Sequence, residues 1–121
     1  MVSVYGYTTV AALELHAATD YGTVDATYTD GVVEAVISQA ERYMNVIMGQ
    51  SFTGTIPDAV VFVTLDVSYR MMFNRMIADG FLIMDGEEHQ KRFEEYLSED
   101  SQLMLKPFIK AQSATRTVWW T

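Results

Sequence analysis

The spacing of apolar residues predicts helices over most of the chain. Between residues 31 and 49, apolar residues recur at intervals of three and four, which is the period of one helix face. The predicted apolar stripe consists of Val33, Val36, Ile37, Ala40, Met44 and Ile47. The polar residues expected to lie mostly away from it are Glu34, Gln39, Glu41 and Arg42. We expect Asp30 to cap this helix and Gly49 to end it.

A shorter helix is predicted before this one, from about residue 10 to residue 18. Val10, Leu13 and Ala17 stand at spacings of three and four, and either Thr8 or Thr9 can cap the start. The segment that follows, TDYGTVDATYTDG, is rich in turn-forming residues and predicts a connector. The chain therefore begins with a short helix joined by a turn to a long one.

The most apolar predicted helix runs from Pro57, a residue favoured at the first helical position, to about Asp79. Valines between residues 60 and 67 also suit a strand. The apolar pattern continues to Ala78, however, and this length favours a helix. We expect this helix to be the central and most buried one, with Gly80 ending it.

A fourth helix is predicted between residues 86 and 106, with Asp85 as its cap. The stretch DGFLIMDG before it predicts a turn or a brief strand. The residues expected to face inward are Phe93, Tyr96, Leu97 and Leu103. Lys106 precedes Pro107, which disfavours helical geometry, so the helix should stop or kink there. Residues beyond it show no helical stripe and are expected to be extended.

These elements predict an all-α fold: a small four-helix bundle-like body over residues 1–106 and an extended C-terminal arm over residues 107–121. A length of 121 residues suits one domain. Half of the residues are hydrophobic and only 20% are charged, which is typical of a packed domain with apolar surface to bury or share. The chain has no cysteine, so packing rather than disulfides must stabilise it.

The net charge of −8 is unevenly distributed. Residues 1–41 contain no lysine or arginine, whereas the segment after Leu105 contains Lys106, Lys110 and Arg116 and no acidic side chain. An acidic body does not favour clamping of nucleic acid, because phosphate binding needs a positive surface. The body is therefore expected to be acidic and the arm basic.

Candidate chemistry is sparse. His16 and His89 do not stand in a metal-binding spacing and are expected on helix surfaces. The acidic connector around Asp25 does not match a calcium loop, and no phosphate loop or nucleophile context occurs. We therefore predict no enzyme activity, no metal and no cofactor. The start of the chain lacks the basic region of a secretory signal and no apolar run is long enough for a membrane span, so we expect the cytoplasm or an assembly built there.

Five methionines lie on predicted helices at positions compatible with a core: Met44, Met48, Met71, Met72 and Met76. Methionine is flexible and fills irregular gaps in cores, so core packing is the favoured interpretation. An adaptable contact surface between subunits is the alternative.

Three segments, taken in order, resemble the head-to-tail connector, or adaptor, family of tailed viruses: YTTVAALELHAAT, VVEAVISQAERYMNVIMGQSF and IPDAVVFVTLDVSYRMMFNRMIADG. In that family a short first helix is followed by one in which an Ala-x-x-Tyr segment leads to Gly-x-x-Phe. Those positions are Ala40, Tyr43, Gly49 and Phe52 here. An Ile-Pro pair, Ile56 and Pro57, then begins the long helix. The resemblance covers residues 5–80.

This resemblance implies a structural protein of the virion neck, between capsid and tail. Members of the family form a ring, commonly of twelve copies, beneath the portal protein. The ring extends the DNA channel and provides a docking surface for a stopper or tail protein, while the C-terminal segment grips the portal. DNA would pass without specific binding, as an acidic body allows.

The arm is the candidate partner-binding segment, because tryptophan and arginine dominate many interfaces. The residues expected to bind the portal or an adjacent subunit are Lys110, Arg116, Val118, Trp119 and Trp120. The alternative is that the two tryptophans fold back into a groove of their own body. The alternative function, from another class, is a free-standing acidic helical regulator or partner-binding module.

Overall fold

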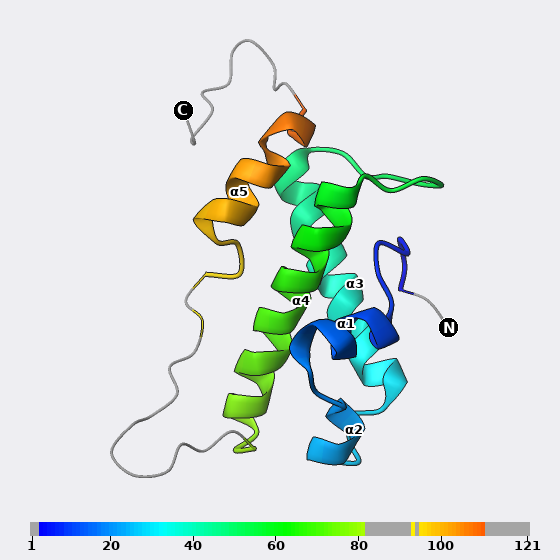
Figure 1. Cartoon of the computed structure of the whole chain (residues 1–121), viewed down its shortest axis with the longest axis vertical. Coiled ribbons are helices and arrows are strands. Elements are labelled where there is room, and N and C mark those ends of the chain that lie inside the picture. The colour runs from blue at the N-terminus through cyan, green and yellow to red at the C-terminus, as the bar shows by residue number, and fades with distance from the viewer. Residues whose placement is uncertain (1–2, 82–92, 94, 111–121) are drawn as a thin grey trace.

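The computed structural model describes residues 3–81, 93 and 95–110, and this part of the chain is all-α, as predicted. Its helices are α1 (Val10–Ala17), α2 (Tyr21–Val24), α3 (Asp30–Met48), α4 (Asp58–Ala78) and α5 (Glu99–Leu105), followed by the 3₁₀ turn η1 (Lys106–Phe108). The long helices α3 and α4 lie side by side and run in opposite directions (Figure 1). Helix α1 packs against both, and α5 packs against α4, so the body is a small helical bundle.

The helix predicted between residues 31 and 49 is confirmed as α3. Thr29 caps it rather than Asp30: its hydroxyl accepts a hydrogen bond from the Val32 N–H at 3.3 Å, and Asp30 is the first helical residue. Gly49 ends α3 at a φ of +69°, a left-handed conformation that glycine adopts at little cost. Five members of the predicted stripe are buried and Ile47 is half-buried.

Helix α4 is central, because it contacts α1, α3 and α5. The valines between residues 60 and 67 are helical, as predicted. Pro57 is the capping residue, so the helix begins one position later than expected. The expectation that α4 is the most buried helix is wrong: nine residues of α3 are buried, against eight in the longer α4. The additional burial in α3 includes polar residues that the chain's N-terminal segment covers.

Helix α1 begins as predicted, with the Thr9 hydroxyl accepting a hydrogen bond from the Ala12 N–H at 3.1 Å. Leu13 is fully buried at its centre. The turn-rich connector contains one feature beyond a turn: the single-turn helix α2, which the side chain of Asp20 caps at the Gly22 N–H. The connector also places Tyr21 and Tyr28 in the core.

The fourth predicted helix, expected between residues 86 and 106, is wrong for the described residues before Glu99. Only Glu99–Leu105 is helical, with Ser98 as its cap, whereas Phe93 and residues 95–98 are not helical. Leu97 is nevertheless buried, but Leu103, expected to face inward, is 67% exposed. The proposed cap Asp85 and residues 82–92 lie outside the described residues.

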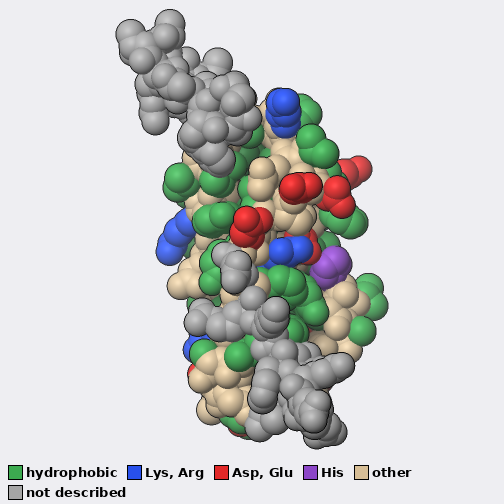
Figure 2. Space-filling view, turned by 90° about the vertical axis from the view of Figure 1, so that its left-hand side faces the viewer, with side chains coloured by type: hydrophobic (Ala, Val, Ile, Leu, Met, Phe, Trp, Pro, Cys, Tyr) green, Lys and Arg blue, Asp and Glu red, His purple; other side chains and the backbone are tan. Residues whose placement is uncertain are grey.

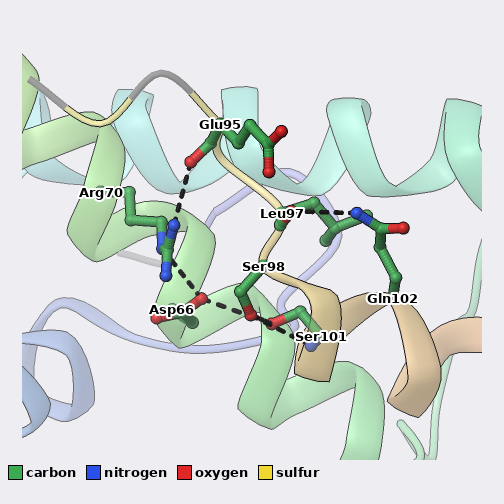
Figure 3. A network of polar contacts seen from close by, with 7 residues as sticks. All are labelled: Asp66, Arg70, Glu95, Leu97, Ser98, Ser101 and Gln102. Atoms are coloured by element: carbon green, nitrogen blue, oxygen red, sulfur yellow. Dashed lines mark hydrogen bonds and ion pairs between the residues drawn. The ribbon is translucent and has the colours of Figure 1, made fainter.

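The physical reason is that side chains of α4 bind this backbone directly; the contact between Arg70 and Glu95 is drawn in Figure 3. The side-chain amide of Asn74 donates to the Phe93 carbonyl at 2.9 Å and accepts from the Phe93 N–H at 2.7 Å. The Arg70 guanidinium donates to the Glu95 carbonyl at 3.1 Å. Backbone groups held in this way are not available for hydrogen bonds along a helix.

The helix stops at Leu105, before Pro107, as predicted. The prediction of an extended arm is wrong for its first two residues: Pro107 and Phe108 belong to the 3₁₀ turn η1, and residues 108–110 contact the body. The Phe108 ring lies 5.9 Å from the ring of Phe52, centroid to centroid, and the Gln50 side-chain amide donates to the Phe108 carbonyl. The Lys110 N–H donates to the Met48 carbonyl at 2.7 Å, so the chain is fastened to the end of α3 at this point.

The core has two parts. The first lies between the second half of α3, the first half of α4 and α5: its buried residues are Tyr7, Ala40, Met44, Met48, Val60, Val63, Val67, Leu97 and Leu105. The second lies beneath α1 and α2: Leu13, Tyr21, Tyr28, Val33, Val36, Ile37, Met72 and Met76. Four of the five methionines singled out are therefore buried, which confirms their prediction as core residues.

Candidate assembly surface

A groove lies between α3, α5 and η1, next to the point where the chain leaves the described residues. Its volume is about 250 Å³. Its lining residues are Ile47, Leu97, Glu99, Gln102, Leu103, Leu105, Lys106 and Ile109. Five of these are apolar, and Leu103 is largely exposed although it is a large aliphatic residue. We call this hollow the α5 groove.

The α5 wall of the groove is held in place by polar contacts with α4 (Figure 3). Asp66 accepts hydrogen bonds from Arg70 at 3.1 Å and from the Ser101 hydroxyl at 3.3 Å. Ser98 caps α5 through the Ser101 N–H at 3.1 Å, and the Gln102 side chain donates to the Leu97 carbonyl at 3.2 Å. The groove is therefore built from residues whose positions the fold determines.

Of the residues predicted to bind a partner, Lys110 alone is described. It is exposed and directly follows Ile109, which lines the α5 groove. Arg116, Val118, Trp119 and Trp120 lie outside the described residues. The structure thus places the start of the predicted binding segment at an apolar groove that the sequence pattern did not reveal.

A second exposed apolar surface lies on α1 and α4. Phe62 is 54% exposed, and the ring of His16 lies against it at 6.3 Å and against the ring of Tyr69 at 6.1 Å, centroid to centroid. Leu15, next to His16 in the chain, is 84% exposed. We call His16, Phe62 and Tyr69 the α1–α4 surface. His16 is exposed, as predicted, and the described residues contain no cluster of three or more potential metal ligands.

The face that carries α5 mixes apolar and charged side chains (Figure 2). Acidic groups gather in its upper half, between exposed apolar side chains. The ion pairs among the described residues are Arg70 with Asp66 at 3.1 Å, within α4, and Arg75 with Asp79, the residue that caps the end of α4, at 3.9 Å. Surface pairs of this kind add little stability, so the charges matter mainly for what the surface attracts or repels.

Helix α3 also has a buried polar face, which the apolar pattern of the sequence did not predict. Glu41, expected to lie away from the apolar stripe, is fully buried. Its carboxylate accepts hydrogen bonds from the Ser3 hydroxyl at 2.6 Å, the Tyr5 N–H at 3.0 Å and the Tyr7 N–H at 2.8 Å. We call these four residues the Glu41 clasp, because they fasten the N-terminal segment to α3.

The clasp extends along the helix in both directions. Ser38, one turn before Glu41, accepts from the Val4 N–H at 3.1 Å. Asn45, one turn after it, accepts from the Tyr7 hydroxyl at 2.6 Å. Glu34 is also buried, at 6% exposure, and neither of its carboxylate oxygens has a hydrogen-bond partner. The polar residues of this face are Glu34, Ser38, Glu41 and Asn45, which stand four, three and four positions apart. This helical spacing was the signal in the sequence for a polar face on α3.

The fold and these surfaces define a small all-α protein with a polar clasp inside and two apolar surfaces outside. Comparison with protein-family models, curated proteins and solved structures found no match to this chain. Among the described residues, no helix combines the length and apolar character that crossing a membrane requires.

Proposed function

We propose that this protein is a structural head-to-tail adaptor of a tailed virus, located in the neck of the virion and without enzymatic activity. Copies of the chain form a ring, commonly of twelve, beneath the portal protein. The ring extends the DNA channel and gives a stopper or tail protein its docking surface. The proposal rests first on the resemblance of residues 5–80 to the adaptor family.

The observation that carries the proposal is the presence of two different exposed apolar surfaces on one small body. The α1–α4 surface and the α5 groove belong to different pairs of helices. A symmetric dimer pairs one surface with itself, whereas a ring joins two different surfaces of neighbouring subunits. Apolar side chains such as Phe62 and Leu103 favour burial in such a contact.

The charge of the chain supports the same function. A net charge of −8 repels DNA, so a channel bordered by such subunits lets the duplex move without holding it. The residues after Leu105 carry lysines and arginine and no acidic side chain, which suits contact with acidic groups of the portal or an adjacent subunit. In the proposed assembly, the arm residues Lys110, Arg116, Val118, Trp119 and Trp120 make that contact.

The experiment measures particle mass and images the purified chain by negative-stain electron microscopy, with and without the portal protein of the same virus. We expect rings, more of them at higher salt, where repulsion between acidic subunits is screened. Phe62→Glu should reduce ring formation, because it places a charge in the subunit contact. The matched control is Gln39→Glu, which adds the same charge at an exposed polar position of α3.

A stable monomer or dimer that ignores the portal under all these conditions would contradict the adaptor proposal. That result would favour the alternative of a free-standing acidic regulator. Equal loss of rings in the Phe62→Glu and Gln39→Glu variants would show that charge alone, rather than the α1–α4 surface, controls assembly.

A further inference from the structure

We infer that, in the free subunit, the α5 groove binds the chain's own segment 118–120, which contains both tryptophans. The groove offers apolar walls from Ile47, Leu97, Leu103, Leu105 and Ile109. Its volume of about 250 Å³ suits a bulky side chain rather than a long peptide. Tryptophan buries more apolar area than other side chains and commonly anchors such contacts.

The position of the chain's exit supports this occupant. Ile109 lines the groove, and the Lys110 N–H is bonded to the Met48 carbonyl at 2.7 Å, so the following residues start at the groove. Eight further residues lead to Val118, a reach of up to roughly 26 Å at about 3.3 Å per residue. This length is sufficient for the chain to turn back. A tethered segment of this length has an effective concentration in the millimolar range, which favours it over a segment from a second copy.

The polar rim of the groove suits the same segment. Glu99 and Gln102 line the groove, and each has a side-chain oxygen that is able to accept a hydrogen bond from an indole N–H. Residues 111–121 contain no acidic side chain, so Glu99 and the neighbouring Asp100 do not repel them. Arg116 adds a positive charge two residues before Val118. The groove and the segment are therefore complementary in both apolar character and charge.

This docking keeps the tryptophans of a free subunit away from other molecules until a partner competes for them. Docking of the segment in its own groove requires neither a ring nor a portal protein. The docking inference can therefore be wrong while the adaptor proposal is correct, and the adaptor proposal can be wrong while the docking inference is correct. Bound to its own groove, the segment would cover Leu103, the most exposed apolar residue lining the groove.

Trp119 and Trp120 are the two tryptophans of the chain, so intrinsic tryptophan fluorescence reports on this segment alone. The experiment measures acrylamide quenching of the full chain and of a peptide with residues 111–121. We expect weaker quenching in the chain than in the peptide. Leu103→Glu should raise quenching to the level of the peptide. The control Val46→Glu, at a residue that is 80% exposed and does not line the groove, should leave it unchanged.

A second measurement serves if Leu103→Glu disturbs the fold, which circular dichroism will reveal. Because the chain has no cysteine, Lys106→Cys at the groove rim and Ala35→Cys, at an exposed position of α3 roughly 18 Å along the helix from Ile47, can each carry a nitroxide label, which quenches nearby tryptophan. We expect strong quenching from position 106 and little from position 35. The inference would be overturned if the unmodified chain were quenched by acrylamide as strongly as the peptide. It would also be overturned if a folded Leu103→Glu variant kept its tryptophans protected from acrylamide. Protection that falls on dilution would overturn it as well, because the occupant would then be a second copy.

Discussion

At the scale of single residues, the carboxylate of Glu41 determines how the N-terminal segment meets the body. The group is fully buried, and burial of a carboxylate is costly unless hydrogen bonds replace its water. The Ser3 hydroxyl and the N–H groups of Tyr5 and Tyr7 provide three such bonds. Charged acceptors make these bonds stronger than neutral ones, so one side chain orders a segment more than 30 positions away.

Glu41→Gln is expected to lower the free energy of unfolding by about 2–4 kcal/mol. The substitution keeps the size of the side chain but turns one acceptor into an N–H₂ donor, which then faces donors that have no partner. The matched control is Glu95→Gln, because the side chain of Glu95 is exposed; it should change stability by less than about 0.5 kcal/mol. Urea unfolding of both variants measures the difference. Equal stability of the two variants would show that the clasp does not stabilise the fold.

At the scale of elements, side chains of α4 determine the backbone conformation of the segment that precedes α5. Arg70 and Asn74, one turn apart on α4, bond to the backbone of Glu95 and Phe93. The Arg70 guanidinium also lies over the Phe93 ring, with 4.6 Å between its central carbon and the ring centroid. These contacts hold the segment before α5 in a non-helical form, and α5 begins only at Glu99.

Asn74→Ala is expected to lower the free energy of unfolding by about 2–3 kcal/mol, because two hydrogen bonds to one backbone unit are lost together. The Phe93 amide should exchange its hydrogen faster, since Asn74 is its acceptor. The control is Arg75→Ala at the next, exposed position, where the pair with Asp79 is 3.9 Å long and contributes little. Hydrogen-exchange mass spectrometry and urea unfolding measure both effects. Unchanged exchange at Phe93 in the Asn74→Ala variant would contradict this account.

At the scale of the whole molecule, buried tyrosines join segments that are distant in sequence. The Tyr28 hydroxyl, in the connector before α3, donates to Asp79 at the end of α4 at 2.6 Å. Burial, the hydrogen bond and the charge of Asp79 raise the pKa of Tyr28. Burial also raises the pKa of Tyr7, Tyr21 and Tyr43, which belong to the N-terminal segment, α2 and α3. The folded state therefore favours the neutral form of all four side chains.

This arrangement makes the protein sensitive to alkali. A pKa that is raised on folding adds stability that is fully present below the unfolded value, about 10 for tyrosine, and is lost as pH rises through the folded value. We therefore expect the free energy of unfolding to fall as pH increases above about 10. Urea unfolding between neutral and alkaline pH measures this loss.

Tyr21→Phe provides the control for that measurement. The Tyr21 hydroxyl is buried without a hydrogen-bond partner, so its removal should leave stability at neutral pH unchanged or higher. The same variant should lose less stability in alkali, because one of the groups with a raised pKa is gone. An alkaline loss as large as that of the unmodified chain would show that Tyr21 does not contribute to it.

Local patterns in the sequence were sufficient for α1, α3 and α4. Apolar spacing identifies the helical faces, threonine and glycine mark several ends, and Pro107 stops the last helix; all of these effects act within a few residues. The methionines of the core were predictable for the same reason. The all-α class followed from these elements, because strands would need a different period.

Tertiary structure alone decided the remaining features, because they depend on contacts between distant residues. Glu34 and Glu41 are polar in sequence and were expected outside, yet both are buried, and the N-terminal segment provides the hydrogen bonds of Glu41. The sequence of residues 93–98 has a helical pattern, but side chains of α4 bind the backbone of Phe93 and Glu95 in a non-helical conformation. The α5 groove likewise exists only where α3, α5 and η1 meet. Periodicity reports which side of a helix is apolar; it does not report which other segment will cover its polar side.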